Sequence, residues 1–355
     1  MRKNKLLQKA AAGLLTLALL LTTAYVPGRN SIRVQAADKP YTEAVNIGNY
    51  KGDIAPKPVD SAHKEWIFAG WYEDDGCEKA VTDKESATGT KYAKFVPAEV
   101  LSVMCQVTEG TTEGTESSKL RVVSTVDNHR YQTVGFEIKI GNNPIIDHKS
   151  KEVFEKIEAI EGHDAFQYSP TDIHEDAQYF STVTIKNIPK RGFATGIRIT
   201  PYWVTLDGTK VYGVARYARV EDYYKKIVNV PVRLYTDEQT NAGYLEVAYD
   251  NGNYEYVGMD VGTVFDQVTV NAADGKVRCV GELANVDNNK AADGMYANLR
   301  FQWKGSGKPS GAVTFSVTNE VFCDKDEKLN YRDKEAKTFD VADVVYKYIT
   351  ASQSK

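Results

Sequence analysis

Short runs of alternating apolar and polar residues, separated by tight-turn signals, occupy most of the chain. The clearest example is "TPYWVTLDGTKVYGVARYARV" at 200–220, where alternating apolar residues flank an Asp207-Gly208 pair. Similar Asp-Gly or Asn-Gly pairs occur at 75–76, 251–252, 274–275 and 293–294. Such pairs favour the positive-φ positions of two-residue hairpin turns. The pattern therefore predicts an all-β fold of antiparallel hairpins.

Two segments have the apolar spacing of a helix instead. In "DHKSKEVFEKIEAIEG" (147–162), Asp147 is a candidate N-cap and Gly162 a candidate C-terminal stop. In "DVADVVYKYI" (340–349), the valines and Tyr348 recur on one side. Both helices would be short additions to a β-fold.

Clusters of turn residues and charges divide the chain into modules. We predict a first unit at 37–97, a second at 98–224 and a third at 225–348, followed by a tail at 349–355. The connections are brief and contain no long Pro- or Ser-rich linker. Neighbouring units are therefore expected to contact one another.

The first 36 residues have the pattern of an export signal. Four Lys/Arg residues precede an apolar run at 10–21, and Val34 and Ala36 provide a small-residue cleavage site. An uncleaved anchor is the alternative, although a run at 10–26 is shorter than the ~20 residues of a typical span. Since no LPxTG motif or hydrophobic tail ends the chain, we expect a secreted, extracellular protein that could associate with the cell surface.

The charge balance argues against a nucleic-acid partner. The whole chain has a net charge of −4, and residues 1–36 contain six Lys/Arg and no Asp/Glu, so their removal leaves −10. Phosphate binding needs a concentrated positive face. We therefore predict no nucleic-acid partner and no membrane span after signal removal.

The four cysteines leave two interpretations open. They fit no zinc spacing. In an oxidising compartment they could form the disulfides Cys77–Cys105 and Cys279–Cys323. Buried free thiols are the alternative, because spacing alone does not fix pairing.

The first unit contains "FAGWY" (68–72), an acidic turn at Asp74 and Asp75, and "YAKF" (92–95). These residues resemble an internalin-type B-repeat, a small β-grasp-like module of Gram-positive surface proteins. Trp and Phe side chains would close a small core, and Gly70 would permit close backbone approach.

The other two units resemble β-sandwich domains. "LRVVSTVDNHRYQTVGFEI" together with "TGIRITPYWVTLDGTKVYGVAR" is similar to immunoglobulin-like sandwiches on secreted proteins of anaerobic Firmicutes. The third unit resembles a cohesin-type sandwich in its Tyr249-Asp250 turn, its Gly262–Phe265 segment and its Asp293-Gly294 step before Leu299–Phe301. The resemblance implies protein–protein recognition, and carbohydrate-binding sandwiches have similar patterns.

Catalytic motifs are absent from the sequence, so we predict no enzyme and no catalytic residue. A loop with five residues of metal-ligating types is interpreted as a solvated loop rather than a metal site: His163, Asp164, His174, Glu175 and Asp176. No cofactor is predicted, although "YDNGN" (249–253) and "DNNKAAD" (287–293) could hold calcium through oxygens.

The resulting hypothesis is a non-catalytic binding, adhesion or scaffold protein that recognises a protein or glycan at the cell surface. The alternative is a secreted enzyme or accessory region that acts on polysaccharide. We expect the third unit to carry the binding surface, with Tyr254 and Tyr256 on one strand face as the binding residues. Tyr296 and Trp303 lie on neighbouring strand-like runs, and Trp303 is expected to face inward.

Overall fold

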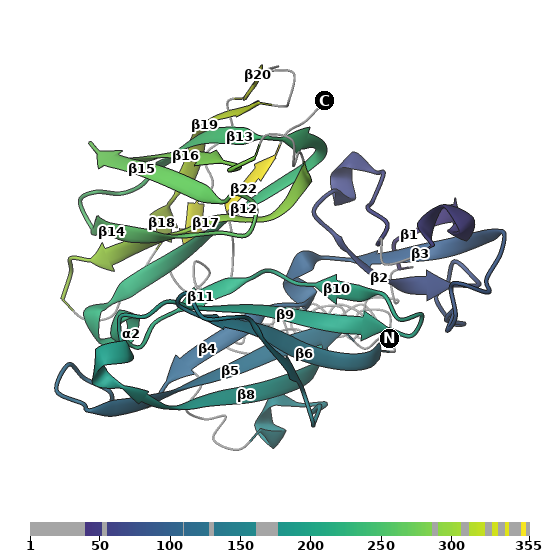
Figure 1. The fold of residues 1–355 in the computed structure, drawn as a ribbon, viewed down its shortest axis with the longest axis horizontal. Helices are drawn as coiled ribbons and strands as arrows, with labels where there is room; N and C mark the ends of the chain where they lie inside the picture. The colour runs from purple at the N-terminus through teal and green to yellow at the C-terminus, as the bar shows by residue number, and fades with distance from the viewer. Residues whose placement is uncertain are drawn as a thin grey trace, which may run out of the picture. The chain divides into compact units, whose positions relative to one another are not determined.

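The computed structural model describes residues 40–355 except 52–54, 109, 128–130, 161–176, 286–289, 307–311, 324–328, 333–337, 341–348 and 353–355. Residues 40–355 form one compact unit. The predicted export signal at 1–36 lies outside the described residues, as does most of the predicted helix at 340–349. The all-β prediction is confirmed, because strands make up nearly all of the regular structure (Figure 1).

The first unit contains a three-stranded antiparallel sheet. Its order is β1 (Thr42–Asn46), β3 (Thr90–Val96) and β2 (Ile67–Tyr72), with short 3-10 turns at Ile47–Tyr50 and Ser61–His63. A bulge in β2 falls between Phe68 and Gly70, where Gly70 has φ +126°. This backbone conformation is accessible to glycine and strained for other residues, which explains why glycine precedes the buried Trp71.

The second unit is a sandwich of two antiparallel sheets. The first sheet is ordered β4 (Val103–Val107), β5 (Ser117–Asp127) and β8 (Ala177–Pro189). The second is ordered β10 (Lys210–Tyr212), β9 (Ile197–Thr205), β6 (Tyr131–Ile140) and β7 (Ile146–Lys149), with β11 (Arg216–Ala218) also pairing with β9. Alternate residues of both sheets fill one core, including Val122, Phe136 and Ile199. Helix α2 (Val220–Lys225) ends the unit.

The helix predicted at 147–162 is wrong. Asp147 lies in β7, which pairs with β6. Among the described residues of this segment, Ile157–Ala159 forms one 3-10 turn and no α-helix is present. Phe154 makes an isolated bridge to Phe180, and Ile157 and Ile160 belong to the same buried cluster as Phe180. Contacts with the sheet therefore override the helical spacing of these apolar residues.

The third unit is also a sandwich of two sheets. One is ordered β14 (Tyr254–Val261), β17 (Lys290–Trp303), β12 (Ile227–Thr240) and β22 (Ile349–Ser352), with β22 parallel to β12. The other is ordered β15 (Gln267–Ala273), β16 (Lys276–Glu282), β13 (Ala242–Ala248), β19 (Ser316–Cys323) and β20 (Leu329–Arg332). The short strands β18 (Ala312–Thr314) and β21 (Thr338–Asp340) pair with each other. The core between the two larger sheets includes Leu245, Leu299 and Phe301.

The first unit shares a hydrophobic core with the second. Trp71 and Phe95 belong to the same buried cluster as Val126 and Trp203. A buried ion pair joins Lys94 of β3 to Asp127 of β5 at 3.8 Å, and the buried Lys84 donates to Thr209 at 2.9 Å. By contrast, the core clusters of the second and third units are separate. The module boundaries themselves remain predictions.

No helix in the described part of the chain is both long and apolar enough to cross a membrane.

Candidate binding surface

The structure corrects the prediction that Tyr254 and Tyr256 form an exposed aromatic pair. Tyr254 is 1% exposed and packs against Trp303 and Phe315 in the core. Tyr256 is half-buried, and the centroid of its ring lies 5.9 Å from that of Phe301. The two tyrosines do share a strand face, but in register with β17 this face covers the core rather than the solvent. Neither residue is placed to bind a large partner.

Two further aromatic residues of the third unit, Tyr296 and Trp303, also pack in the core. Tyr296 is fully buried, and its hydroxyl donates to the carbonyl oxygen of Gly243 at 2.7 Å. Trp303 is partly buried against the same core, as its alternation with Leu299 and Phe301 predicts. Burial raises the pKa of Tyr254 and of Tyr256 to about 12. Tyr254, Tyr256, Tyr296 and Trp303 therefore stabilise the core of the sandwich.

Of the two interpretations left open for the cysteines, the structure supports free thiols at Cys77, Cys105 and Cys279. Cys77, Cys105 and Cys279 are free thiols, and burial raises the pKa of Cys77 to about 11 and of Cys279 to about 12. Strand β13 lies between β16, which carries Cys279, and β19, which carries Cys323. Strands two positions apart are about 9.5 Å apart, whereas bridged Cα atoms lie within about 7 Å.

The candidate metal loops are only partly described. The loop with His163 and His174 lies outside the described residues, as do the side chains of the 287–293 loop. In the 249–253 loop, the carboxylate of Asp250 accepts from the backbone amide of Gly252 at 2.9 Å and from the side chain of Asn253 at 2.7 Å. These hydrogen bonds lower the pKa of Asp250, and they show that its carboxylate stabilises the turn itself. Among the described residues, no group of His, Cys, Asp and Glu is arranged to hold a metal ion.

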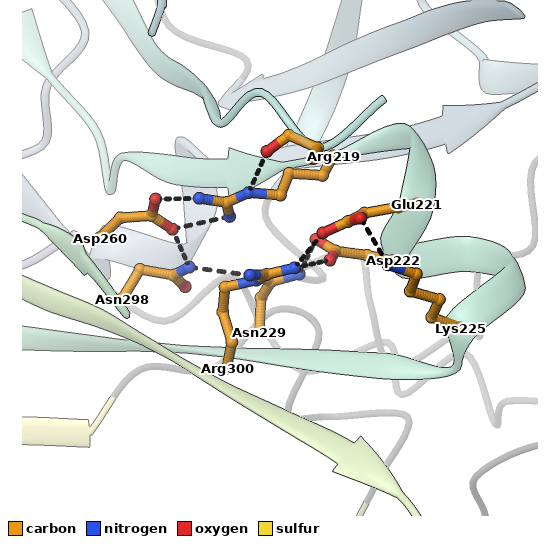
Figure 2. A network of polar contacts seen from close by, with 9 residues as sticks. Arg219, Glu221, Asp222, Lys225, Asn229, Asp260, Asn298 and Arg300 are labelled. Atoms are coloured by element: carbon orange, nitrogen blue, oxygen red, sulfur yellow. Dashed lines mark hydrogen bonds and ion pairs between the residues drawn. The ribbon is translucent and has the colours of Figure 1, made fainter. Parts of the chain in front are cut away.

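A network of charged and polar side chains lies between helix α2 and the sheet of β12, β14 and β17 (Figure 2). In it, Arg300 donates to Glu221 at 2.9 Å and to Asp222 at 2.7 Å. Arg219 pairs with Asp260, which also accepts from Asn298 at 2.9 Å. The labelled members are Arg219, Glu221, Asp222, Lys225, Asn229, Asp260, Asn298 and Arg300. Three acidic and three basic residues balance one another.

The pKa shifts in this network reflect its burial and its pairing. Burial raises the pKa of Asp222 despite the nearby Arg300. Burial also acts to raise the pKa of Glu221, but hydrogen bonds from Lys225 and Arg300 outweigh it and lower that pKa. A general acid or base needs a carboxylate that can reach a substrate, and these carboxylates are already held by Arg or Lys. The network therefore anchors α2 to the third unit rather than forming a catalytic pair.

The outward face of the sheet β15–β16–β13 has a different character. Along β16, Val277 and Cys279 point into the core, so Lys276, Arg278 and Val280 alternate onto the solvent side. Gly281 also faces inward, where an added Cβ would lie 2.4 Å from the ring of Phe265. This packing fixes the register of the strand and leaves Val280 46% exposed in the interior of the sheet.

Val280 lies in a row of uncharged side chains. It is opposite Thr269 of β15 on one side and Tyr244 of β13 on the other. Thr269 is exposed and Tyr244 is half-buried. We call Thr269, Val280 and Tyr244 the central row of this face.

Charged residues flank the central row. Glu246 accepts from Lys276 at 2.6 Å and from Arg278 at 2.9 Å, which leaves this group of three with one net positive charge. On the other side of the row lies the exposed Glu282. A small apolar centre with a charged rim is the composition typical of a protein-binding surface.

Sequence reasoning singled out Tyr254 and Tyr256 on β14, which face the core, and did not single out the exposed face of β16. The run "KVRCVGE" (276–282) contains the signal that was missed, since Val280 breaks the polar series formed by Lys276, Arg278 and Glu282. Finding it required knowing that Cys279 rather than Val280 faces the core.

Comparison with known proteins finds similarity only among solved structures. No protein-family model and no curated protein matches the chain. The sixth cohesin of scaffoldin B from Acetivibrio cellulolyticus, solved in complex with a dockerin, is 16% identical, with a TM-score of 0.26 over 40% of this chain and 86% of that chain. The cohesin module of a family 33 glycoside hydrolase from Clostridium perfringens is 12% identical, with a TM-score of 0.24 over 45% and 88%. A non-cellulosomal cohesin from Archaeoglobus fulgidus is 10% identical, with a TM-score of 0.24 over 32% and 89%.

Proposed function

We propose that the chain is a non-catalytic extracellular binding protein, and that its third unit recognises a protein partner through the outward face of β15, β16 and β13. The observation that supports this most strongly is Val280, a β-branched side chain held 46% exposed in the interior of a sheet face. A partner that covered the central row would bury Val280 and Tyr244 and meet the charges of Lys276 and Arg278 at the rim.

The charged rim makes the proposal more specific. Lys276 and Arg278 share one carboxylate, that of Glu246, so their side of the row carries an excess positive charge. A partner with acidic residues on this side would therefore associate faster, and more so at low salt. The secreted location and the adhesion or scaffold role are part of the same proposal, and they rest on the sequence pattern of residues 1–36.

The test is affinity capture from the producer's secreted proteins with three matched baits. The baits are the unmodified chain, Val280→Asp, and Ile146→Asp as a control on the second unit. Ile146 is the matched site because it is 53% exposed on strand β7. We expect one protein to be retained by the unmodified chain and by Ile146→Asp, and lost from Val280→Asp. Equal capture by all three baits would contradict the proposed surface.

The alternative, an enzyme acting on polysaccharide, is tested with the same preparations. Release of reducing ends from a polysaccharide panel by the unmodified chain would overturn the non-catalytic assignment. We expect the chain to release none above the buffer control.

A further inference from the structure

Strand β15 is an unprotected edge of its sheet. Among the strands that the structure describes, it pairs with β16 alone, and it lies at the outer margin of the sheet in Figure 1. Its sequence "QVTVNAA" contains no charged residue and no proline, and its seven pairs with β16 have no register shift. Natural sheets usually protect an edge with a lysine, a proline or a bulge, because an open edge pairs readily with another strand. The lack of these features in β15 points to a strand that pairs with it.

The turn after β15 determines which of its backbone groups are free. Asp274 and Gly275 have φ values of +53° and +73°, so they form a two-residue turn of the hairpin type. In such a hairpin the flanking residues, Ala273 and Lys276, form a hydrogen-bonded pair. Hydrogen-bonded positions recur at every second residue of β15. The residues that alternate with them direct their N–H and C=O groups away from β16, toward the open edge. They are Val268, Val270 and Ala272.

We propose that the chain forms a two-fold symmetric dimer by antiparallel pairing of β15 with β15 of a second copy, centred on Val270. In this register Val270 lies opposite Val270 of the second copy, and Val268 lies opposite Ala272. These are the three residues whose backbone groups are free, so each pair forms both of its N–H···O bonds. The interface uses the same surface on both copies and therefore closes on itself.

The side chains fit this register on both faces of the sheet. Val268 and Val270 are half-buried against the core of their own copy, and pairing brings them beside Ala272 and Val270 of the second copy. On the solvent face, Thr269 of one copy lies opposite Asn271 of the other, and both side chains are exposed and uncharged. No like charges meet within the strand, so the pairing avoids the main cost of joining identical edges.

The nearest charges lie just beyond the two ends of the strand. Asp266 of one copy would face Asp274 of the other, and both residues are exposed. Their repulsion is screened by salt. Because a seven-residue edge buries less than the ~1,200 Å² of a standard stable interface, the dimer should be weak and concentration-dependent, and salt should tighten it.

Sedimentation velocity of the full chain from about 1 µM to about 500 µM tests the proposal over the range expected of a weak interface. We expect a reversible monomer–dimer equilibrium. Thr269→Lys/Asn271→Lys places lysine opposite lysine in both cross-strand pairs and should weaken association about tenfold or more. Thr269→Glu/Asn271→Lys is the matched variant: it changes the same exposed positions but places opposite charges face to face, so it should restore the dimer.

The outcomes separate this dimer from others. A chain that stays monomeric at every concentration overturns the proposal. A dimer that Thr269→Lys/Asn271→Lys leaves intact also overturns the proposal, since that dimer uses another surface. A dimer that both double variants abolish overturns it as well. Asp274→Asn keeps a residue suited to positive φ and removes the end charge, so it should tighten the dimer and reduce its salt dependence. The dimer does not depend on the proposed binding function, because β15 pairs through its edge.

Discussion

Replacing the guanidinium of Arg300 with an uncharged group should destabilise the third unit more than removal of a comparable surface charge. Its guanidinium donates to Glu221 and Asp222, and its side chain is only 11% exposed. Arg300→Met keeps the aliphatic part of the side chain and deletes the charge. The substitution would leave Asp222, which is 4% exposed, as a buried carboxylate that has lost its cation.

The magnitude follows from burial. Removing one partner of a buried ion pair typically costs about 3–5 kcal/mol, because the remaining charge is desolvated and uncompensated. An exposed pair contributes about 1 kcal/mol or less. Lys225→Met is therefore the matched control: Lys225 pairs with the same Glu221, but its side chain is 45% exposed. We expect a loss of about 3 kcal/mol or more for Arg300→Met and of at most about 1 kcal/mol for Lys225→Met.

The assay is urea unfolding followed by circular dichroism at pH 7.5 and at pH 5. Burial already raises the pKa of Asp222, and loss of Arg300 would raise it further. A carboxyl group with a raised pKa in the folded state gains stability as the pH falls through that pKa. The deficit of Arg300→Met relative to the unmodified chain should therefore shrink at pH 5. Equal effects of the two substitutions, or a deficit that grows at pH 5, would refute the reasoning.

Three further predictions concern buried groups. Tyr254→Phe should be nearly neutral at pH 8, because the buried hydroxyl has no hydrogen-bond partner among the described residues. Above pH 10 the variant should be the more stable protein, since a folded-state pKa of about 12 for Tyr254 makes the unfolded chain ionise first. A difference in melting temperature that does not change with pH would contradict this. Intact-mass measurement after iodoacetamide treatment of the native protein should show Cys105 and Cys279 unmodified, because both thiols are buried and have raised pKa values; rapid labelling would contradict their burial. Trp71→Ala should cost about 3–5 kcal/mol and should also destabilise the second unit that shares its core, so independent cooperative folding of an isolated 40–97 fragment would contradict the shared core.

The sequence contains enough information to predict the fold class and some of its turns. Two of the expected hairpin turns are wrong: Asp293-Gly294 lies inside strand β17, and Asn251-Gly252 connects strands of two different sheets. The Asp274-Gly275 pair forms the β15–β16 turn with positive φ at both residues, as its composition predicts. The alternation of apolar residues along "VGFEI" (134–138) matches the burial of Val134, Phe136 and Ile138 in the structure. These features depend on local backbone preferences and on the period of two along a strand, both of which can be read from a single sequence.

Features that depend on partners distant in sequence could not be predicted in the same way. Alternation places Tyr254 and Tyr256 on one face, but only their pairing with Trp303 and Phe301 shows that this face is buried. The apolar residues at 147–162 do have helical spacing, yet β7 in this segment pairs with β6, and Phe154 pairs with Phe180. These contacts favour extended backbone over a helix. Arg300 is separated in sequence from its partners Glu221 and Asp222 by 79 and 78 positions, so no local pattern in the sequence indicates this network.

The most direct test of the proposed binding surface is photo-crosslinking from the central row. The photoreactive residue p-benzoylphenylalanine is placed at Val280 in one sample and at Ile146 in a control sample, and each is irradiated with the producer's secreted proteins. Both positions are exposed on strands, so the probe is equally accessible in the two samples. We predict a covalent adduct with one other protein from position 280 and none from position 146. The same adducts from both positions, or an adduct at position 280 with only a second copy of the chain, would contradict a partner-binding role for this face.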